Sequence, residues 1–170
     1  MIAQAGQTIR FFSLTITVLS LAACSSNPAA PPAVKQPSSG QVVTRVERTT
    51  AGARAAAVAL DQVGVPYRYG GSTPSGFDCS GLVQYSYTRA GVRVPRTTGQ
   101  LWSASNPVGS DELRAGDLLF FSIEGKMSHV GVYLGQQRFV HAPQSGRKVS
   151  VASLNSPFYR AAFLRAGRPY

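Results

Sequence analysis

The order in which helical and strand patterns follow one another most constrains how this chain can fold. Between residues 51 and 104 the chain has three stretches with helix-forming patterns. From residue 118 onward, short runs rich in β-branched and aromatic residues alternate with turn residues. Such an order predicts an α+β fold, with N-terminal helices packed on a mostly antiparallel sheet of about five strands. The predicted strands span residues 118–121, 129–134, 138–142, 148–154 and 158–166.

Capping and stop residues bound the predicted helices. A first helix over 51–63 has Thr50 as its cap and is ended by Gly64 and the nearby Pro66. A turn-rich stretch over 70–78 then leads into a second helix that begins at Asp78-Cys79 and stops at Gly91, and a weaker third helix covers 98–104.

The first 23 residues read as an export signal. A short polar start is followed by about a dozen mostly apolar residues, which is too few to cross a bilayer. The segment ends in Leu21-Ala22-Ala23-Cys24, which resembles the lipobox of bacterial lipoproteins. That resemblance implies cleavage before Cys24 and acylation of its thiol, and Ser25 behind it implies sorting to the periplasmic face of the outer membrane. An ordinary signal peptide with an incidental cysteine is the alternative.

Residues 24–50 are predicted to be the lipidated cysteine and a flexible tether, because this stretch is rich in proline and lacks periodicity. Residues 51–170 form the predicted folded domain. An anchor with more than one acyl chain holds a protein stably on a membrane that it does not span.

The chain has 17 Lys and Arg residues against 7 Asp and Glu residues, for a net charge of +10. The basic residues are scattered singly, with one adjacent pair, Arg147-Lys148. Nucleic-acid binders usually gather such charge on one stripe or tail. We therefore expect no nucleic-acid partner, and an acidic polymer fits the excess better.

The reactive residue types are Cys79, His129 and His141. If lipidation consumes Cys24, then Cys79 has no disulfide partner, and such a cysteine is either buried and inert or reactive. Its place in the first turn of a helix favours reactivity, because a helix N-terminus lowers a thiol pKa and offers N–H groups to an oxyanion.

A hairpin with a turn at 135–137 sets His141 near Gly131 and thus close to His129, so that one imidazole can orient the other. Cys79, His129 and His141 then supply a nucleophile, a base and an orienting group. A zinc site is disfavoured because close ligand pairs are absent, and we expect neither a metal nor another cofactor.

Five sequence blocks, taken together, resemble the NlpC family of bacterial cell-wall cysteine peptidases. The resemblance covers roughly residues 52–168 and implies a papain-like α+β fold with the nucleophile at a helix N-terminus. It also implies hydrolysis of amide bonds in the stem peptides of peptidoglycan. The blocks are Pro66-Tyr67-Arg68-Tyr69-Gly70-Gly71, Gly76-Phe77-Asp78-Cys79-Ser80-Gly81-Leu82-Val83, Gly116-Asp117-Leu118-Leu119-Phe120-Phe121, Ser128-His129-Val130-Gly131-Val132-Tyr133 and Phe139-Val140-His141-Ala142.

The resemblance assigns roles to single residues. Cys79 matches the nucleophile, His129 the base, and His141 the residue that orients the base. Tyr67 matches a tyrosine beside the nucleophile, and its alternative is an ordinary strand aromatic. Asp78 and Ser80 match positions that anchor a substrate amine in some members, and their alternatives are a helix cap and first-turn packing.

The bond cleaved stays open at this point. Members cut either the D-alanyl to diaminopimelate cross-link or the γ-D-glutamyl to diaminopimelate link, and we lean to the first because we expect no wall-binding module in 170 residues. A catalytically inactive peptidoglycan-binding lipoprotein and acyl chemistry on a lipid or small molecule are the other hypotheses.

Overall fold

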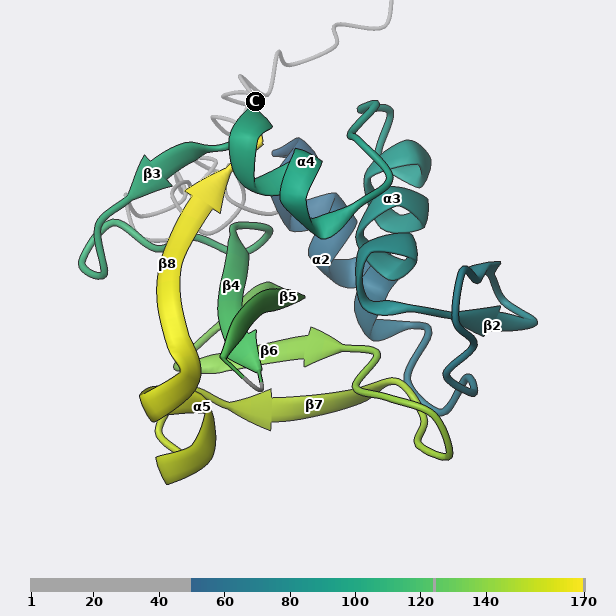
Figure 1. Ribbon diagram of the computed structural model, residues 1–170. Coiled ribbons are helices and arrows are strands. Elements are labelled where there is room, and N and C mark those ends of the chain that lie inside the picture. Colours follow the sequence, from purple (N-terminus) through teal and green to yellow (C-terminus); the bar gives the residue numbers. More distant parts are fainter. Residues whose placement is uncertain (1–49, 124, 170) are drawn as a thin grey trace, which may run out of the picture. The chain divides into compact units, whose positions relative to one another are not determined.

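The computed structural model describes residues 50–123 and 125–169 (Figure 1). Its first half carries three helices, α2 (Ala51–Leu60), α3 (Cys79–Arg89) and α4 (Thr98–Ala104), as predicted. Each is capped by a side chain: Thr50 accepts from Ala53 N, Asp78 from Gly81 N, and Thr97 with Gln100 forms a capping box. The helix α2 ends three residues before its predicted end, in turns that lead to Gly64, whose φ is +95°.

The second half forms a six-stranded, fully antiparallel sheet, which confirms the predicted fold class with one strand more. The spatial order is β3-β8-β4-β5-β6-β7, and a separate two-stranded hairpin, β1-β2, precedes α3. The residue bounds are β1 Ser72–Thr73, β2 Gly76–Phe77, β3 Asn106–Val108, β4 Leu118–Ile123, β5 Lys126–Gly135, β6 Arg138–His141, β7 Ser150–Ser153 and β8 Phe163–Arg168.

The hairpin between β5 and β6 differs from prediction in its turn but agrees in its pairing. Gln136 and Gln137 alone form the turn, with φ of +52° and +58°, as a two-residue type I′ turn requires. An irregularity in the register between Tyr133 and Gly135 compensates for the shorter turn. Val132 therefore still pairs with Val140, which is the register predicted for His141.

The predicted strand over 158–166 is wrong in its first half. Residues Pro157–Ala162 form a short helix, α5, and only Phe163–Arg168 are extended. The Ser156 hydroxyl accepts from Tyr159 N at 3.3 Å, and proline at the first helical position removes an N–H that would lack a partner. These local signals outweigh the strand propensity of Phe158 and Tyr159.

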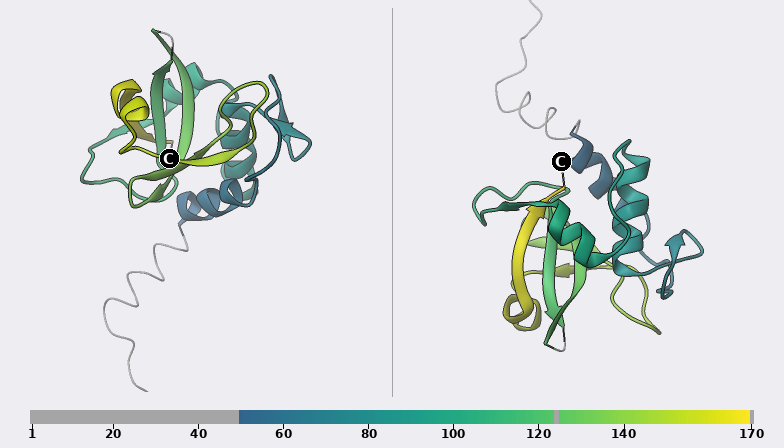
Figure 2. Two further views of the ribbon diagram at one scale, coloured as in Figure 1. Left: turned by 90° about the horizontal axis from the view of Figure 1, so that it is seen from below. Right: turned by 45° about the horizontal axis from the view of Figure 1, so that its top comes forward.

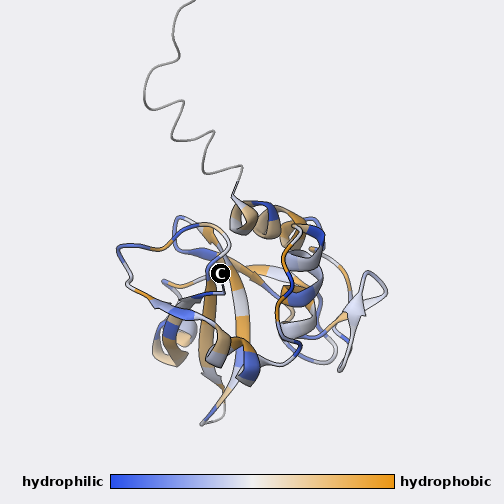
Figure 3. Cartoon of the chain, turned by 90° about the horizontal axis from the view of Figure 1, so that it is seen from above, coloured by the Kyte–Doolittle hydropathy of each residue, from blue (hydrophilic) through white to orange (hydrophobic). Residues whose placement is uncertain are grey.

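Both faces of the sheet are buried, which explains the uninterrupted Leu118–Phe121 run. Leu118 and Phe120 pack toward α2 and α3, whereas Leu119 and Phe121 pack toward α5. Figure 2 shows α2 and α3 together on one side of the sheet, and Figure 3 shows hydrophobic residues concentrated along the central strands. The sheet is thus a rigid support between two apolar layers.

Residues 1–49, including Cys24, lie outside the described residues. The lipobox, the tether and the boundary at residue 51 therefore stay predictions. Within the described ranges, the helices are too short or too polar to cross a membrane.

Candidate active site

Cys79 is the first residue of α3, as predicted, and it is held there by tight packing behind the helix. A Cβ atom on Gly81 would come within 1.9 Å of the Gly71 carbonyl oxygen, so the glycine of the Asp78-Cys79-Ser80-Gly81 motif permits this approach. Asp78 N also donates to Gly71 O at 3.1 Å. The backbone of Gly71 therefore fixes the start of α3, and with it the position of Cys79.

The thiol of Cys79 lies against β5. Its Sγ is 3.8 Å from the carbonyl oxygen of Ser128, the residue before His129, and 3.6 Å from the hydroxyl of Thr98 in α4. Burial raises the pKa of Cys79, and hydrogen bonds from Thr98 and from the Val130 backbone only partly oppose it. This net direction corrects the expectation that the helix N-terminus lowers the thiol pKa, because desolvation is the larger effect.

The two histidines meet as the hairpin register predicted. His129 Nε2 and His141 Nδ1 are 2.7 Å apart, and both side chains are buried. The second nitrogen of His141, Nε2, is 3.3 Å from the hydroxyl of Tyr159 on α5. Three side chains from β5, β6 and α5 thus form one hydrogen-bonded chain.

Burial keeps both imidazoles neutral near pH 7. It lowers the pKa of His129 to about 4, and burial together with the neighbouring His129 lowers the pKa of His141 to about 3. Burial also raises the pKa of Tyr159, so its hydroxyl keeps its proton. In a neutral pair one ring nitrogen donates and the other accepts, so the direction of each bond depends on the tautomers.

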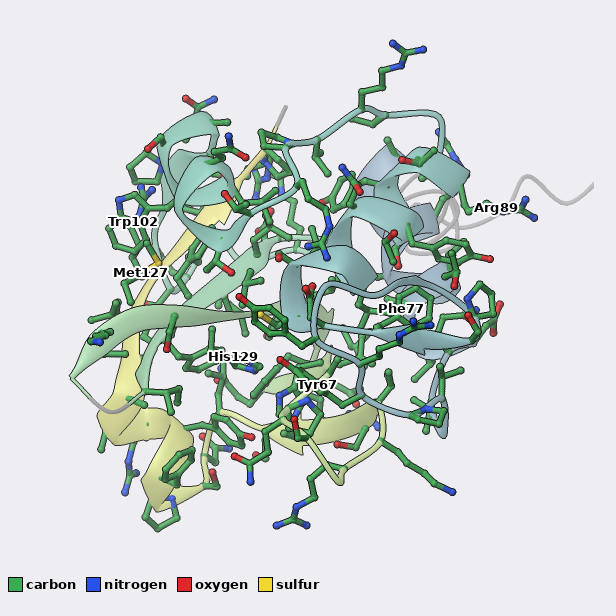
Figure 4. The ribbon with its side chains drawn as sticks, turned by 45° about the vertical axis from the view of Figure 1, so that its right-hand side comes forward. Tyr67, Phe77, Arg89, Trp102, Met127 and His129 are labelled. Atoms are coloured by element: carbon green, nitrogen blue, oxygen red, sulfur yellow. The ribbon has the colours of Figure 1, made fainter. Side chains whose placement is uncertain are left out.

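Cys79, His129 and Tyr67 line one cleft of about 280 Å³, together with Tyr159 and Gln144. In Figure 4, Tyr67 and His129 are close to one another at the centre of the view, whereas Arg89 lies at the periphery. Cys79 and His129 share the cleft without a hydrogen bond between them. Such bonds often tighten only when substrate is bound.

Asp78 and Ser80 lie together, but other groups already hold them. Arg96 donates to both carboxylate oxygens of Asp78, at 2.9 and 2.7 Å, and to the Ser80 hydroxyl at 2.9 Å. The same carboxylate accepts from Gly81 N at 2.6 Å and Gly70 N at 3.0 Å. Asp78 is therefore a helix cap, as the alternative interpretation held. With Ser80 Oγ at 3.3 Å, its carboxylate already accepts hydrogen bonds from five donors, and a substrate amine would be a sixth.

Sequence reasoning missed three residues of this site: Arg96, Thr98 and Tyr159. Ser156-Pro157 is a helix-start signal that could have placed Tyr159 on a helix. Nothing in the sequence indicated that Thr98 reaches Cys79 or that Arg96 reaches Asp78, because these contacts span 19 and 18 residues.

The arrangement can carry out nucleophilic acyl chemistry. It supplies a thiol at a helix N-terminus, a neutral imidazole in the same cleft, and a second imidazole that fixes the first. Within residues 50–123 and 125–169, no group of three or more His, Cys, Asp or Glu side chains is arranged to hold a metal ion.

Comparison with known proteins agrees with this fold. Residues 64–168 match the NlpC/P60 family, so the chain belongs to that family. Among solved structures, the chain is similar to a lipoprotein-like protein of the NLP/P60 family from Staphylococcus aureus Mu50. The TM-score is 0.62 and the identity 34%, over 69% of this chain and 41% of that one.

Two curated relatives carry activity names. The chain is 39% identical over 115 residues to murein DD-endopeptidase MepH of Escherichia coli K12, which covers 64% of this chain and 42% of that protein. It is 42% identical over 114 residues to the bifunctional muramidase/DL-endopeptidase CwlT of Bacillus subtilis 168, over 65% of this chain and 34% of that protein. The chain thus spans less than half the length of these relatives.

Proposed function

We propose that this protein is a cysteine peptidase that hydrolyses amide bonds in the stem peptides of peptidoglycan. The observation that carries the proposal is the cleft lined by Cys79 and His129, with His129 bonded to His141 at 2.7 Å. Membership of the NlpC/P60 family and the endopeptidase names of the relatives support the same reaction and substrate class.

The tautomers of the histidine pair follow from the task of the base. To accept the thiol proton on Nδ1, His129 must carry its own proton on Nε2 and donate it to His141 Nδ1. His141 then carries its proton on Nε2 and donates it to the Tyr159 hydroxyl oxygen. The chain of hydrogen bonds supports His141 as the orienting residue and Tyr159 as the group that fixes the tautomer of His141.

Because the thiol and the imidazole are both neutral at rest, proton transfer accompanies the attack. The Cys79 proton moves to His129 Nδ1 while Sγ forms a bond to the substrate carbonyl carbon. The backbone N–H groups of Cys79 and Ser80 lie in the first turn of α3, where a helix supplies no carbonyl acceptor of its own, and they can donate to the oxyanion. His129 then protonates the departing amine, and water hydrolyses the thioester to restore the thiol.

Tyr67 lies in the same cleft, and we assign its hydroxyl to substrate binding beside the thiol. Burial and the adjacent Cys79 and Asp78 raise the pKa of Tyr67, so it is a hydrogen-bond donor in this role.

For the bond cleaved, we propose the D-alanyl to diaminopimelate cross-link. The E. coli relative is named a DD-endopeptidase, whereas the B. subtilis relative is named a DL-endopeptidase. For the alternative γ-D-glutamyl bond, we would assign the substrate amine to an anchor at Asp78 and Ser80. A substrate ammonium there would compete with Arg96, which supports the cross-link as the first choice.

The proposal is tested by digestion of purified sacculi. We expect wild-type protein to release soluble fragments and Cys79→Ala protein to release none, with Ser103→Ala, in an exposed position, as a matched control. Mass spectrometry of the fragments identifies the bond. Equal digestion by the Cys79→Ala variant would disprove a cysteine peptidase, and fragments cut within single stems would overturn the cross-link assignment.

We also propose that Cys24 is acylated and holds residues 51–170 on a tether at the periplasmic face of the outer membrane. The lipobox and the lipoprotein-like relative from S. aureus support the acylation, and Ser25 behind the lipobox supports the outer membrane. A Cys24→Ala variant should move from the membrane to the soluble fraction, and mass spectrometry of the mature N-terminus should find the acyl chains only in the wild type.

A further inference from the structure

A second hollow lies beside the catalytic cleft and is lined by two cations. Its volume is about 660 Å³, and its lining includes Arg147, Lys148 and Ser150. It shares four lining residues with the catalytic cleft: Pro143, Gln144, Phe158 and Tyr159. The two spaces are therefore neighbours along one surface.

Arg147 and Lys148 differ in their contacts from the arginines that hold other parts of the fold together. Arg96 and Arg168 are paired with Asp78 and Asp117, and Arg165 stacks on Trp102 at 3.9 Å. In contrast, the side chains of Arg147 and Lys148 make no hydrogen bond or ion pair within the part of the chain that the structure describes. Both are exposed, so their charges are available to a ligand.

The backbone ties these two residues to the active site. Tyr67 N donates to Arg147 O at 2.8 Å, and Val149 N donates to Val65 O at 2.8 Å. Pro66 also forms a β-bridge with Lys148. The segment that carries the cations is thus fixed against the segment that carries Tyr67, and the distance between the hollow and the cleft is set by these bonds.

No acidic side chain lines either space among the described residues. Residues 51–170 carry thirteen Lys and Arg against six Asp and Glu, so the wider field also favours an anion. Ser150 adds a hydroxyl donor. This combination suits a carboxylate, which accepts from guanidinium, ammonium and hydroxyl groups.

We propose that the hollow lined by Arg147, Lys148 and Ser150 binds a free carboxylate on the leaving-amine side of the substrate. It lies against His141 and Tyr159, on the histidine side of the cleft, away from the start of α3 where the oxyanion would be held. The amine released by His129 would leave on this side. In either candidate bond that amine belongs to diaminopimelate, whose second carboxylate is available to the hollow.

This inference rests on the proposed peptidoglycan hydrolysis, so its test separates the two. Purified cross-linked muropeptides are offered with the diaminopimelate carboxylate either free or amidated. The charge-reversal variant Arg147→Glu/Lys148→Glu is compared with Arg93→Glu/Arg138→Glu, which changes the same charge at exposed positions that line neither space.

We expect the wild type and the control to prefer the free carboxylate about tenfold in kcat/KM, mainly through KM. The Arg147→Glu/Lys148→Glu variant should lose that preference, so that its kcat/KM for the free carboxylate no longer exceeds its kcat/KM for the amidated substrate. A swap that keeps both charges, Arg147→Lys/Lys148→Arg, should keep most of it. If the wild type cleaves both substrates equally well, the carboxylate site is refuted and the hydrolase stands; if it cleaves neither, the proposed function fails.

Discussion

The hydroxyl of Tyr159 offers the sharpest test of how the histidine pair is set up. Substituting Tyr159→Phe removes one hydrogen bond, at 3.3 Å to His141 Nε2, and keeps the ring that packs 5.0 Å from Phe139 and 5.4 Å from Phe121. The fold should therefore be preserved. What changes is the relative free energy of the two tautomers of His141.

The size of the effect follows from the bond that is lost. A neutral hydrogen bond contributes about 1 kcal/mol net. Without it, His141 can carry its proton on Nδ1 and donate to His129 Nε2, which forces the His129 proton onto the nitrogen that should accept from Cys79. We expect kcat/KM to fall about fivefold, because roughly 1 kcal/mol is lost from the competent arrangement.

The assay combines steady-state cleavage of muropeptides with nitrogen NMR of the two imidazoles, which reports the tautomers directly. The matched control is Tyr133→Phe, which also removes a hydroxyl with one hydrogen bond of 3.3 Å, from Gln137 N, at the far end of the hairpin. Unchanged tautomers and a kcat/KM within twofold of wild type in the Tyr159→Phe variant would refute the reasoning. An equal loss in Tyr133→Phe would show a general packing effect instead.

Three further predictions concern polar groups in and beside the site. The folded pKa of His129, about 4, lies below the unfolded value of about 6.5. The His129 contribution to the free energy of unfolding should therefore fall by about 3 kcal/mol as pH drops through this window. In chemical denaturation, His129→Gln should reduce the pH dependence but not abolish it, because His141 titrates over the same range. Thr98→Val removes a hydrogen bond that lowers the Cys79 pKa, so alkylation of the thiol at pH 8 should slow about threefold, and an unchanged rate would exclude that bond. Arg96→Met should cost about 2 kcal/mol in thermal unfolding, less than a fully buried pair because Arg96 is partly exposed; a loss below about 0.5 kcal/mol would argue against the pair.

Local patterns in the sequence were enough to predict much of the fold and the histidine pair. Cys79 begins its helix because Asp78 is a good cap, and a cap acts on N–H groups only three residues away. His129 and His141 meet because both lie on one hairpin, whose register depends on the turn. These interactions join residues that are close in the sequence, so the sequence alone is enough to predict them.

The tertiary structure decided what depends on distant contacts. Tyr159 reaches His141 only because β8 inserts between β3 and β4 and brings α5 over the sheet, and Thr98 reaches Cys79 because α4 packs on β5. The tertiary structure also decided whether the pKa of Cys79 is raised or lowered. The helix N-terminus can be predicted from the sequence, but the depth at which the thiol is buried cannot. Desolvation depends on every element that covers a group, and those elements are assembled only by the complete fold.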